Sequence, residues 1–385
     1  MTYTMSSVGE YVLPDFGPDP YFERYLNRGQ VHCGEEHIKN MFQVVWPIIS
    51  SYAQTIVGQR DMRSYTALGM FAIGDRNGKR RMPGHVFLLG YPGTGKTLLA
   101  TTPTEVVGGS AARFQGAADV LPTDYTGNRI IDIDPMTQQK CFKFIPGPGF
   151  TVFQILDEFN RLSPKTQGGL LEALGEGTIT NFGETRVIPL PPFAIITANP
   201  VESEGTYPLS DAFLDRIMFQ IVPKDFTADE FAEIIDRTRN SHRRRFTQVC
   251  SAERIKEVRE FFDDTIWIDS EIKNRMGKFA ARTNDLRAAG LLARLHDLVG
   301  GNILRKGLSG RGISHWAGAA IALAAFRYRD YVLIDDAKKV LIPFLRHRLI
   351  FEPGVLQFLA SDVFKTRDIV EARDRLILEL IREAW

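Results

Sequence analysis

The sequence predicts an α/β fold, in which a parallel sheet has helices on both faces and a smaller all-α domain follows. Two patterns indicate this. Short apolar strands alternate with helical segments up to about residue 222, as expected of a parallel sheet. Beyond Pro223 the strand signals stop and amphipathic helical segments take over. These segments are Ala228–Arg239, Ala252–Phe262 and Asp285–Leu298.

The chain divides into four predicted parts. They are an N-terminal extension (1–40), the α/β domain (41–222), the helical domain (223–350) and a C-terminal helical extension (351–385). Prolines interrupt the first part, and Pro353 followed by glycine separates the last. From Ile38 to Ile73, apolar residues recur at helical spacing around the turn Ile56-Val57-Gly58-Gln59. We therefore expect two helices with a sharp connection before the first strand of the sheet.

The composition is that of an ordinary soluble globular protein, with 44% hydrophobic and 24% charged residues. The 47 basic residues nearly balance the 46 acidic ones, so overall charge does not support a nucleic-acid or anionic-membrane partner. The first residues lack the features of a secretory signal, and the longest apolar stretch, Ala317–Phe326, is too short to cross a bilayer and predicts a buried helix. Three scattered cysteines fit a reducing compartment. We expect a cytoplasmic protein without a membrane span.

The stretch Gly90-Tyr91-Pro92-Gly93-Thr94-Gly95-Lys96-Thr97 satisfies every position of the phosphate-binding P-loop pattern G-x-x-x-x-G-K-[ST]. An apolar run over 85–89 predicts a buried strand before it, and a helix opens at Lys96. The glycines let the backbone turn its N–H groups toward a phosphate at the positive end of that helix. Lys96 would reach the outer phosphates and Thr97 would hold magnesium. We expect Gly90 to Leu98 to contact a nucleotide.

Hydrolysis also needs a metal carboxylate and a base. A largely apolar strand ends in Asp157 and Glu158. Asp157 would complete the magnesium shell, and Glu158, pointing to the other side, would deprotonate the attacking water. Adjacent acids are also common on surface turns, but a P-loop about 60 residues upstream favours the catalytic interpretation. Asn199, at the end of another buried strand, either holds the lytic water or the outer phosphate, or simply forms the turn before Pro200.

Further stretches match one family at fixed spacings. They are Ile56–Gln59, Gly84–Val86, Arg113–Gln115, Leu121–Gly127, Pro146–Phe150, Leu156–Arg161, Lys165–Gln167, Leu170–Leu174, Glu202–Leu209, Leu214–Arg216, Arg329–Val332 and Leu345–Leu349. With the P-loop, they make the chain resemble the MoxR family of AAA+ ATPases, within the clade that inserts an extra hairpin into the second helix of the core. The resemblance covers roughly residues 56 to 350 and implies a P-loop NTPase core with a helical lid domain.

The resemblance implies roles that spacing alone does not. Asn199 corresponds to sensor 1, and Arg216 to the arginine finger that enters the neighbouring subunit's site. Arg311 corresponds to the sensor 2 arginine and would act on the nucleotide of its own subunit. The nucleotide is implied to be ATP with Mg²⁺, and we expect Val57 and Gly58 beside it. The family also implies a homo-oligomer in the form of a hexameric ring, a protein client, and a partner with a von Willebrand factor A domain.

Two inserted hairpins are also expected. Ile130–Ile133 and Cys141–Phe144 are short apolar strands around a polar turn, which resembles the helix-2 insert. Thr178–Phe182 and Thr185–Leu190 flank Gly183 and resemble the hairpin before sensor 1. In rings of this family such hairpins commonly face the central channel. Alternatively they only cover the sheet edge, and the sequence leaves both interpretations open.

The chain departs from the family pattern at three positions. Pro103 should kink or end the helix after the P-loop. Ala198 replaces the usual glutamine before the sensor asparagine, and Gly310 replaces the usual proline before Arg311.

Three functions remain under consideration. The first is a ring-forming ATPase that remodels or activates a protein client, and the second is a slow ATP-gated assembly scaffold. The third is a nucleic-acid-associated motor, for which Arg243-Arg244-Arg245 is the strongest basic cluster. That cluster is more easily explained as a solvated or interface patch, so we do not expect a nucleic-acid partner.

Overall fold

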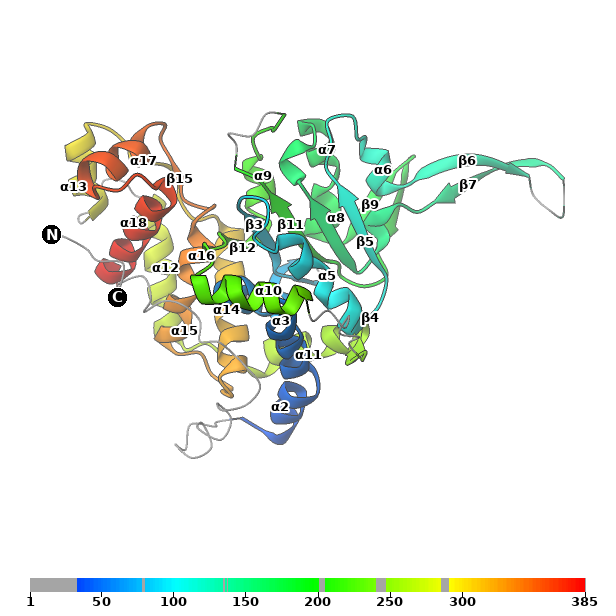
Figure 1. Ribbon diagram of the computed structural model, residues 1–385, viewed down its shortest axis with the longest axis horizontal. Helices are drawn as coiled ribbons and strands as arrows, with labels where there is room; N and C mark the ends of the chain where they lie inside the picture. Colours follow the sequence, from blue (N-terminus) through cyan, green and yellow to red (C-terminus); the bar gives the residue numbers. More distant parts are fainter. Residues whose placement is uncertain are drawn as a thin grey trace.

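The computed structural model describes residues 33–77, 80–133, 136, 138–200, 205–239, 247–284 and 291–384. At its centre lies a five-stranded sheet in the order β12-β3-β11-β8-β5 (Figure 1). Every neighbouring pair is parallel, so the carboxyl ends of the strands meet at one edge. The strands are β3 (His85–Leu89), β5 (Ala111–Gln115), β8 (Phe153–Asp157), β11 (Phe193–Ala198) and β12 (Ile217–Ile221).

Successive residues of β3 pack on opposite faces of this sheet. Val86 and Leu88 belong to one hydrophobic core, which includes side chains of α3, α4 and α5. Phe87, between them, belongs to a second core with side chains of α8 and α9. This alternation is the period of a strand, and it confirms the predicted sheet with helices on both faces. The helices are α3 (Trp46–Thr55), α4 (Arg60–Phe71), α5 (Lys96–Val106), α7 (Pro164–Gly169), α8 (Leu171–Glu176) and α9 (Asp211–Leu214).

The segment before β3 contains the two predicted helical runs and one unpredicted hairpin. Helix α2 (Glu35–Asn40) continues through a π-helical turn (Met41–Val45) into α3, and α4 follows the connection. Within that connection Gly58 and Gln59 both have positive φ, 58° and 47°, which produces the sharp turn. An antiparallel hairpin then joins β1 (Ile73–Asn77) to β2 (Arg80–Pro83). Its many charged residues conceal the apolar alternation by which a strand is recognised.

Pro103 does not end α5, although ending the helix was one of the two outcomes expected of it. The helix continues to Val106, and the N–H of Val107 bonds to the carbonyl of Pro103. The proline removes only the hydrogen bond that its own N–H would have made. Leu99, Ala100 and Val106 are buried, and the helix packs against α3 and β8. Packing of its apolar face therefore outweighs the local cost of the proline.

Both predicted hairpins are present. In the β6–β7 hairpin Ile131 lies opposite Phe142, and the ribbon projects far from the body of the molecule (Figure 1). The β9–β10 hairpin turns at Phe182 and Gly183, whose φ angles of 52° and 77° are those expected of a type I′ turn. In the first hairpin's turn, residues 134, 135 and 137 lie outside the described ranges. The elements are α6 (Pro122–Thr126), β6 (Asn128–Ile133), β7 (Lys140–Ile145), β9 (Thr178–Asn181) and β10 (Glu184–Val187).

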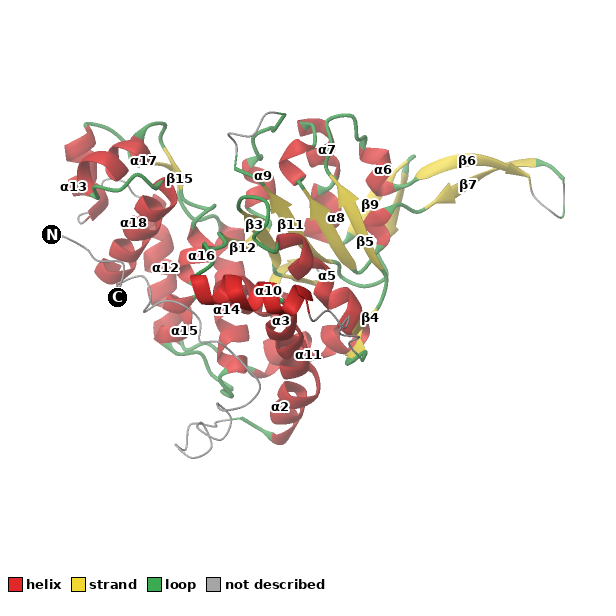
Figure 2. Cartoon of the chain, viewed as in Figure 1, coloured by secondary structure: helices red, strands yellow, loops and turns green. Residues whose placement is uncertain are grey.

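The chain after β12 is predominantly helical (Figure 2). Its first helix begins and ends as predicted, and the apolar stretch 317–326 is a buried part of α14. Of the predicted helix Asp285–Leu298, the part from Leu291 is helical, and residues 285–290 lie outside the described ranges. The helix α12 was not predicted. The helices are α10 (Ala228–Arg239), α11 (Ala252–Thr265), α12 (Ser270–Asn284), α13 (Leu291–Val299), α14 (Gly310–Phe326), α15 (Ile334–Lys339), α16 (Leu341–Leu345), α17 (Val355–Phe358) and α18 (Ile369–Ala384).

The prediction that strands are absent beyond Pro223 was wrong. Strand β13 (Cys250–Ser251) pairs in parallel with β4 (Val107–Gly108), and β14 (Leu304–Lys306) pairs antiparallel with β15 (Ile350–Phe351). Strands of two or three residues are too short to show a period-two pattern. In the described ranges no helix has the length and apolar content needed to cross a membrane.

Candidate functional site

The P-loop joins β3 to α5 at the carboxyl edge of the sheet. Gly93 and Gly95 have φ angles of 87° and 83°, a left-handed conformation that glycine adopts without strain. A Cβ atom placed on Gly93 would meet nothing within 4 Å. The loop therefore borders open space at the start of α5, where unpaired N–H groups favour an anion. Tyr91 and Leu98 are 66% and 51% exposed around this space.

Lys96 is buried at the base of the loop, with 8% of its surface exposed. Its ammonium group donates to the carbonyls of Gly90 and Tyr91 and lies 3.4 Å from Oδ1 of Asn199. Burial lowers the pKa of Lys96, and the nearby carboxylates of the site partly offset this effect. A phosphate in the loop would restore the charge balance around this ammonium.

Asp157 ends β8 beside the first turn of α5. Its Oδ2 atom lies 3.4 Å from the Thr97 hydroxyl, and its Oδ1 atom accepts a hydrogen bond from the Thr197 hydroxyl. Carboxylate and hydroxyl oxygens suit Mg²⁺, which one or two carboxylates hold together with phosphate oxygens and water. In the described ranges there is no group of three or more His, Cys, Asp or Glu side chains that could hold a metal by itself. The residues present fit a magnesium–nucleotide complex.

Arg113 is a residue of this site that the sequence argument missed. From β5 its Nε and Nη2 atoms donate to Oδ2 of Asp157, at 3.1 and 2.5 Å. Nη2 also donates to Gln115, at 2.9 Å. The sequence does contain a pattern that indicates this contact, because an arginine two residues before the end of one strand can reach an acid at the end of a neighbouring strand. The contact can be predicted only if β5 and β8 are known to be neighbours. The sequence does not specify that pairing.

Glu158 has a left-handed backbone conformation, with φ 51° and ψ 43°, which is uncommon for a residue with a side chain. Its N–H donates to the Thr197 hydroxyl at 3.0 Å, and its carboxylate accepts from Arg161 at 3.0 Å. A Cβ on Gly116 would lie 2.2 Å from the Glu158 carbonyl, so only glycine permits this close approach. The Glu158 side chain is 31% exposed, beside that of Arg161.

Asn199 directly follows β11. Its side chain faces Lys96, and its carbonyl accepts from the amide of Asn160 at 2.9 Å. The predicted residues of the phosphate and metal site are therefore gathered at the carboxyl ends of three adjacent strands. They are Lys96 and Thr97 after β3, Asp157 and Glu158 at β8, and Asn199 after β11.

The turn that contains Val57 and Gly58 lies beside the same loop. The nearest atom to a Cβ placed on Gly95 is Cδ1 of Ile56, at 3.9 Å. Val57 is buried. Gly58 lies against the carboxylate of Glu230 on α10, which a side chain at position 58 would displace. The structure thus brings α10 next to this turn.

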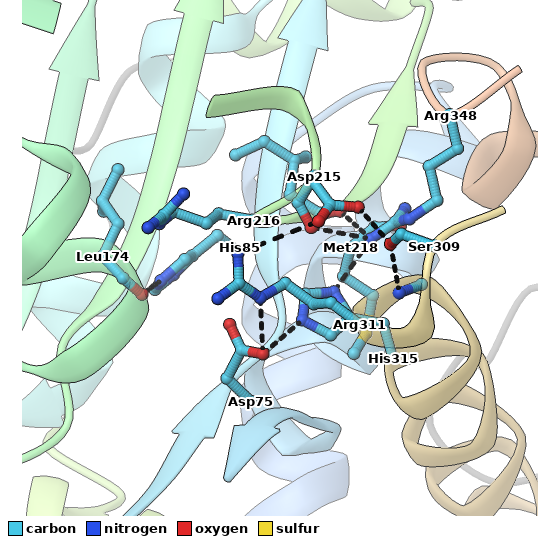
Figure 3. A network of polar contacts seen from close by, with 12 residues as sticks. Asp75, His85, Leu174, Asp215, Arg216, Met218, Ser309, Arg311, His315 and Arg348 are labelled. Carbon is cyan, nitrogen blue, oxygen red and sulfur yellow. Dashed lines mark hydrogen bonds and ion pairs between the residues drawn. The ribbon is translucent and has the colours of Figure 1, made fainter. Parts of the chain in front are cut away.

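Arg216 and Arg311 form a separate polar network (Figure 3). Arg216 ends the segment after α9, and its Nη1 atom donates to the Ala212 carbonyl at 2.8 Å. Burial lowers its pKa, and the neighbouring Arg311 lowers it further. Arg311, in the first turn of α14, donates from Nε to Asp75 at 2.9 Å and lies 3.8 Å from Asp215.

This network lies at the amino end of the sheet. Ile217, the residue after Arg216, pairs with His85, the first residue of β3. A strand of five residues spans about 13 Å, and the P-loop begins beyond the far end of β3. Arg311 therefore lies beside Arg216 and away from the P-loop of its own chain. This position does not support the expectation that Arg311 acts on its own subunit's nucleotide.

Buried imidazoles hold this end of the sheet to the helical domain. Arg348 donates to Nδ1 of His315 at 2.8 Å, and Nε2 of His315 lies 3.4 Å from Asp75. His85 bonds through Nε2 to the Leu174 carbonyl at 2.7 Å. Burial lowers the pKa of His85 to about 4 and also lowers that of His315. Both imidazoles are therefore neutral at pH 7.

Comparisons with known proteins agree with this arrangement. Residues 85–219 match the model of the ATPase family associated with various cellular activities (AAA), and residues 302–366 match the AAA lid domain. The chain is 32% identical to the uncharacterized protein YeaC of Bacillus subtilis over 301 residues, which cover 78% of this chain and 85% of YeaC. It is 32% identical to the chaperone MoxR1 of Mycobacterium tuberculosis over 271 residues, 69% and 68% of the two chains.

Among solved structures, a candidate ATPase of Cytophaga hutchinsonii superposes with a TM-score of 0.71 at 27% sequence identity. The superposition covers 89% of this chain and 96% of that one. It therefore includes the helical part as well as the sheet.

Proposed function

The chain belongs to the MoxR family of AAA+ ATPases, and we propose that it uses ATP hydrolysis to remodel, mature or activate a protein client. A protein with a von Willebrand factor A domain is the proposed partner. The observation that carries the proposal is that Lys96, Asp157 and Glu158 lie together at one edge of the sheet. The same molecule has a long hairpin, β6–β7, that projects from its body (Figure 1). A relative of 32% identity is named a chaperone.

In this proposal the loop N–H groups and Lys96 hold the phosphates of ATP. Magnesium, held by Thr97 and Asp157, would neutralise charge on the transferred phosphoryl group. The oxygen of the attacking water bonds to the γ-phosphorus while Glu158 takes a proton from that water. The bond from the γ-phosphorus to the leaving ADP oxygen breaks in the same step. Asn199 orients the water or the outer phosphate from the other side.

We further propose a hexameric ring in which Arg216 and Arg311 both reach the nucleotide of the neighbouring subunit. Support comes from their shared position at the amino end of the sheet, beside Asp75 and Asp215. Two cations side by side repel each other, and Arg311 adds to the lowering of the Arg216 pKa that burial causes. A triphosphate from a neighbour would relieve that repulsion. This assignment replaces the role that the resemblance implied for Arg311.

The β6–β7 hairpin is the proposed contact with the client. Cross-strand pairing places Ile131, Ile133 and Phe142 on one face of the ribbon, where they are 67%, 56% and 75% exposed. Exposed apolar patches of this kind mark interaction sites. The base of the ribbon is held by the β9–β10 hairpin, because Arg129 pairs with Glu184. The basic cluster at 243–245 lies outside the described ranges, and no described feature favours a nucleic-acid motor or a scaffold.

The test is nucleotide-dependent capture of a client by the full chain in its native host. Glu158→Gln should retain ATP and therefore hold client and partner together, while Lys96→Ala should hold neither. Co-purified proteins are identified by mass spectrometry for both variants and for the wild type. The same proteins at the same yield with all three would contradict ATP-driven remodelling. Full ATPase activity of Glu158→Gln would contradict the assignment of the base.

A further inference from the structure

We propose that Arg113 competes with magnesium for the Asp157 carboxylate, so that the metal must displace this guanidinium when a nucleotide binds. The inference rests on the proposed nucleotide site. It assigns to Arg113 a competing role, which lowers the affinity of the site for magnesium before nucleotide binds. It also makes that affinity adjustable through residues that do not touch the nucleotide.

The contact geometry carries the inference. Both donors of Arg113 bond to Oδ2 of Asp157, which is the oxygen that faces the Thr97 hydroxyl at 3.4 Å. The other oxygen, Oδ1, is already bonded to the Thr197 hydroxyl. The guanidinium therefore lies on the side of the carboxylate where Thr97 could share a metal with it. A positive group at that place repels a divalent cation and occupies its ligand.

The two partners differ in their freedom to move. The side chain of Asp157 is 6% exposed, whereas that of Arg113 is 51% exposed. The Arg113 Nη2 atom also donates to Gln115 at 2.9 Å. If magnesium takes Oδ2, the guanidinium can swing toward solvent and keep its bond to Gln115. Asp157 therefore stays in place, while the Arg113 guanidinium can move to solvent and remain bonded to Gln115.

A purely structural role would have the opposite consequence. If Arg113 only held Asp157 in position, its removal would disorder the carboxylate and weaken magnesium binding. If Arg113 competes, its removal leaves a buried carboxylate with one fewer cation, and such a group binds the next available cation more tightly. The sign of the change in magnesium affinity therefore separates the two roles.

The experiment is a magnesium titration of the full chain with a fluorescent ADP analogue, which avoids turnover. For Arg113→Met we expect the half-saturating magnesium concentration to fall on the order of tenfold, from loss of one nearby positive charge, with binding of the analogue in EDTA unchanged. Gln115→Ala removes the alternative partner and should raise that concentration. Arg129→Met, which breaks the pair with Glu184 and the contact with the Phe182 ring, is the matched control and should change neither value.

The outcomes distinguish this inference from the proposed function. If the wild type shows no magnesium-dependent binding of the analogue, the nucleotide site itself is wrong. If the wild type binds but Arg113→Met has unchanged or weaker magnesium affinity, competition by Arg113 is wrong and the nucleotide site stands. Thermal unfolding of each variant identifies a folding defect. If Arg113→Met has a folding defect, the test rests on Gln115→Ala. Unchanged or tighter magnesium binding by Gln115→Ala also overturns the proposal.

Discussion

In the proposed ring, the two ends of the central sheet carry different halves of a catalytic site. At the carboxyl end, glycines line open space and Lys96 lies against backbone carbonyls. At the amino end, the half-buried Arg216 and Arg311 lie in a network with acids and imidazoles. The length of β3, about 13 Å, separates them. One chain thus has the P-loop at one end of the sheet and, at the other end, two arginines that do not reach this loop. Assembly into a ring would bring the arginines of one subunit to the P-loop of the next.

The largest expected effect on nucleotide binding comes from removing the cation of the carboxyl end. Lys96→Ala should weaken ATP binding by about 100-fold or more, because a charge-assisted contact to the phosphates is lost from an otherwise buried site. Equilibrium binding of a fluorescent ATP analogue measures this. Lys165→Ala, at an exposed position on α7, is the control and should bind like the wild type. Wild-type affinity of Lys96→Ala would remove the P-loop assignment.

The second effect tests whether the two ends serve different subunits. Arg216→Ala should bind ATP normally and lose activity by about 10³-fold to 10⁵-fold, as for other arginine fingers. Mixed rings of Lys96→Ala and Arg216→Ala should regain measurable ATPase activity, since some interfaces combine an intact loop with an intact finger. Pull-down of differently tagged subunits verifies co-assembly. Full activity of Arg216→Ala alone would eliminate the role.

A second mixing experiment tests which nucleotide Arg311 contacts. If both arginines serve the neighbour, rings that mix Arg216→Ala with Arg311→Ala contain no interface with both arginines intact and stay inactive. If Arg311 serves its own subunit, the same mixture contains intact interfaces and recovers activity. Mixing Arg311→Ala with Lys96→Ala is the positive control and should recover activity in the first case. Recovery of activity when Arg216→Ala is mixed with Arg311→Ala would show that Arg311 acts on the nucleotide of its own chain.

The same comparison explains what the sequence could and could not predict. The P-loop depends on neighbours in sequence, so its position between β3 and α5 was predictable, and the apolar runs of β8 and β11 correctly predicted strands ending at Asp157 and before Asn199. The placement of Arg311 depends on how α14 packs across the molecule. Gly318 lets that helix approach β1 so closely that a Cβ would lie 1.8 Å from the Ile73 carbonyl.

Local rules also failed where packing opposed them. Pro103 was expected to kink or end α5, yet the helix continues to Val106 with its apolar face buried. Arg113 is visible in the sequence only as one residue of a matched stretch, and its contact with Asp157 requires the strand order. The individual roles of the site residues stay predictions that the variants above address. The domain boundaries at 40, 222 and 350 also stay predictions.

The smallest expected effect concerns stability at the amino end. Folding lowers the pKa of His85 from 6.5 to about 4, because the imidazole is buried. Between these values the unfolded chain binds a proton that the folded chain does not, so stability is full above pH 6.5 and declines as the pH falls toward 4. At pH 5 the loss from His85 is about 2 kcal/mol. Burial lowers the pKa of His315 and His347 as well, which adds to the loss.

Denaturant unfolding at pH 7 and pH 5 measures this dependence. His85 donates from Nε2 to the Leu174 carbonyl and accepts at Nδ1 from the Ala194 N–H. His85→Gln offers an amide that can donate and accept in the same places without titrating, so its unfolding free energy should change less between the two pH values. His296→Gln, on α13 and outside this network, is the matched control and should follow the wild type. If His85→Gln lost as much stability as the wild type on acidification, the acid sensitivity would lie elsewhere, and the neutral imidazole at the amino end of β3 would not be its source.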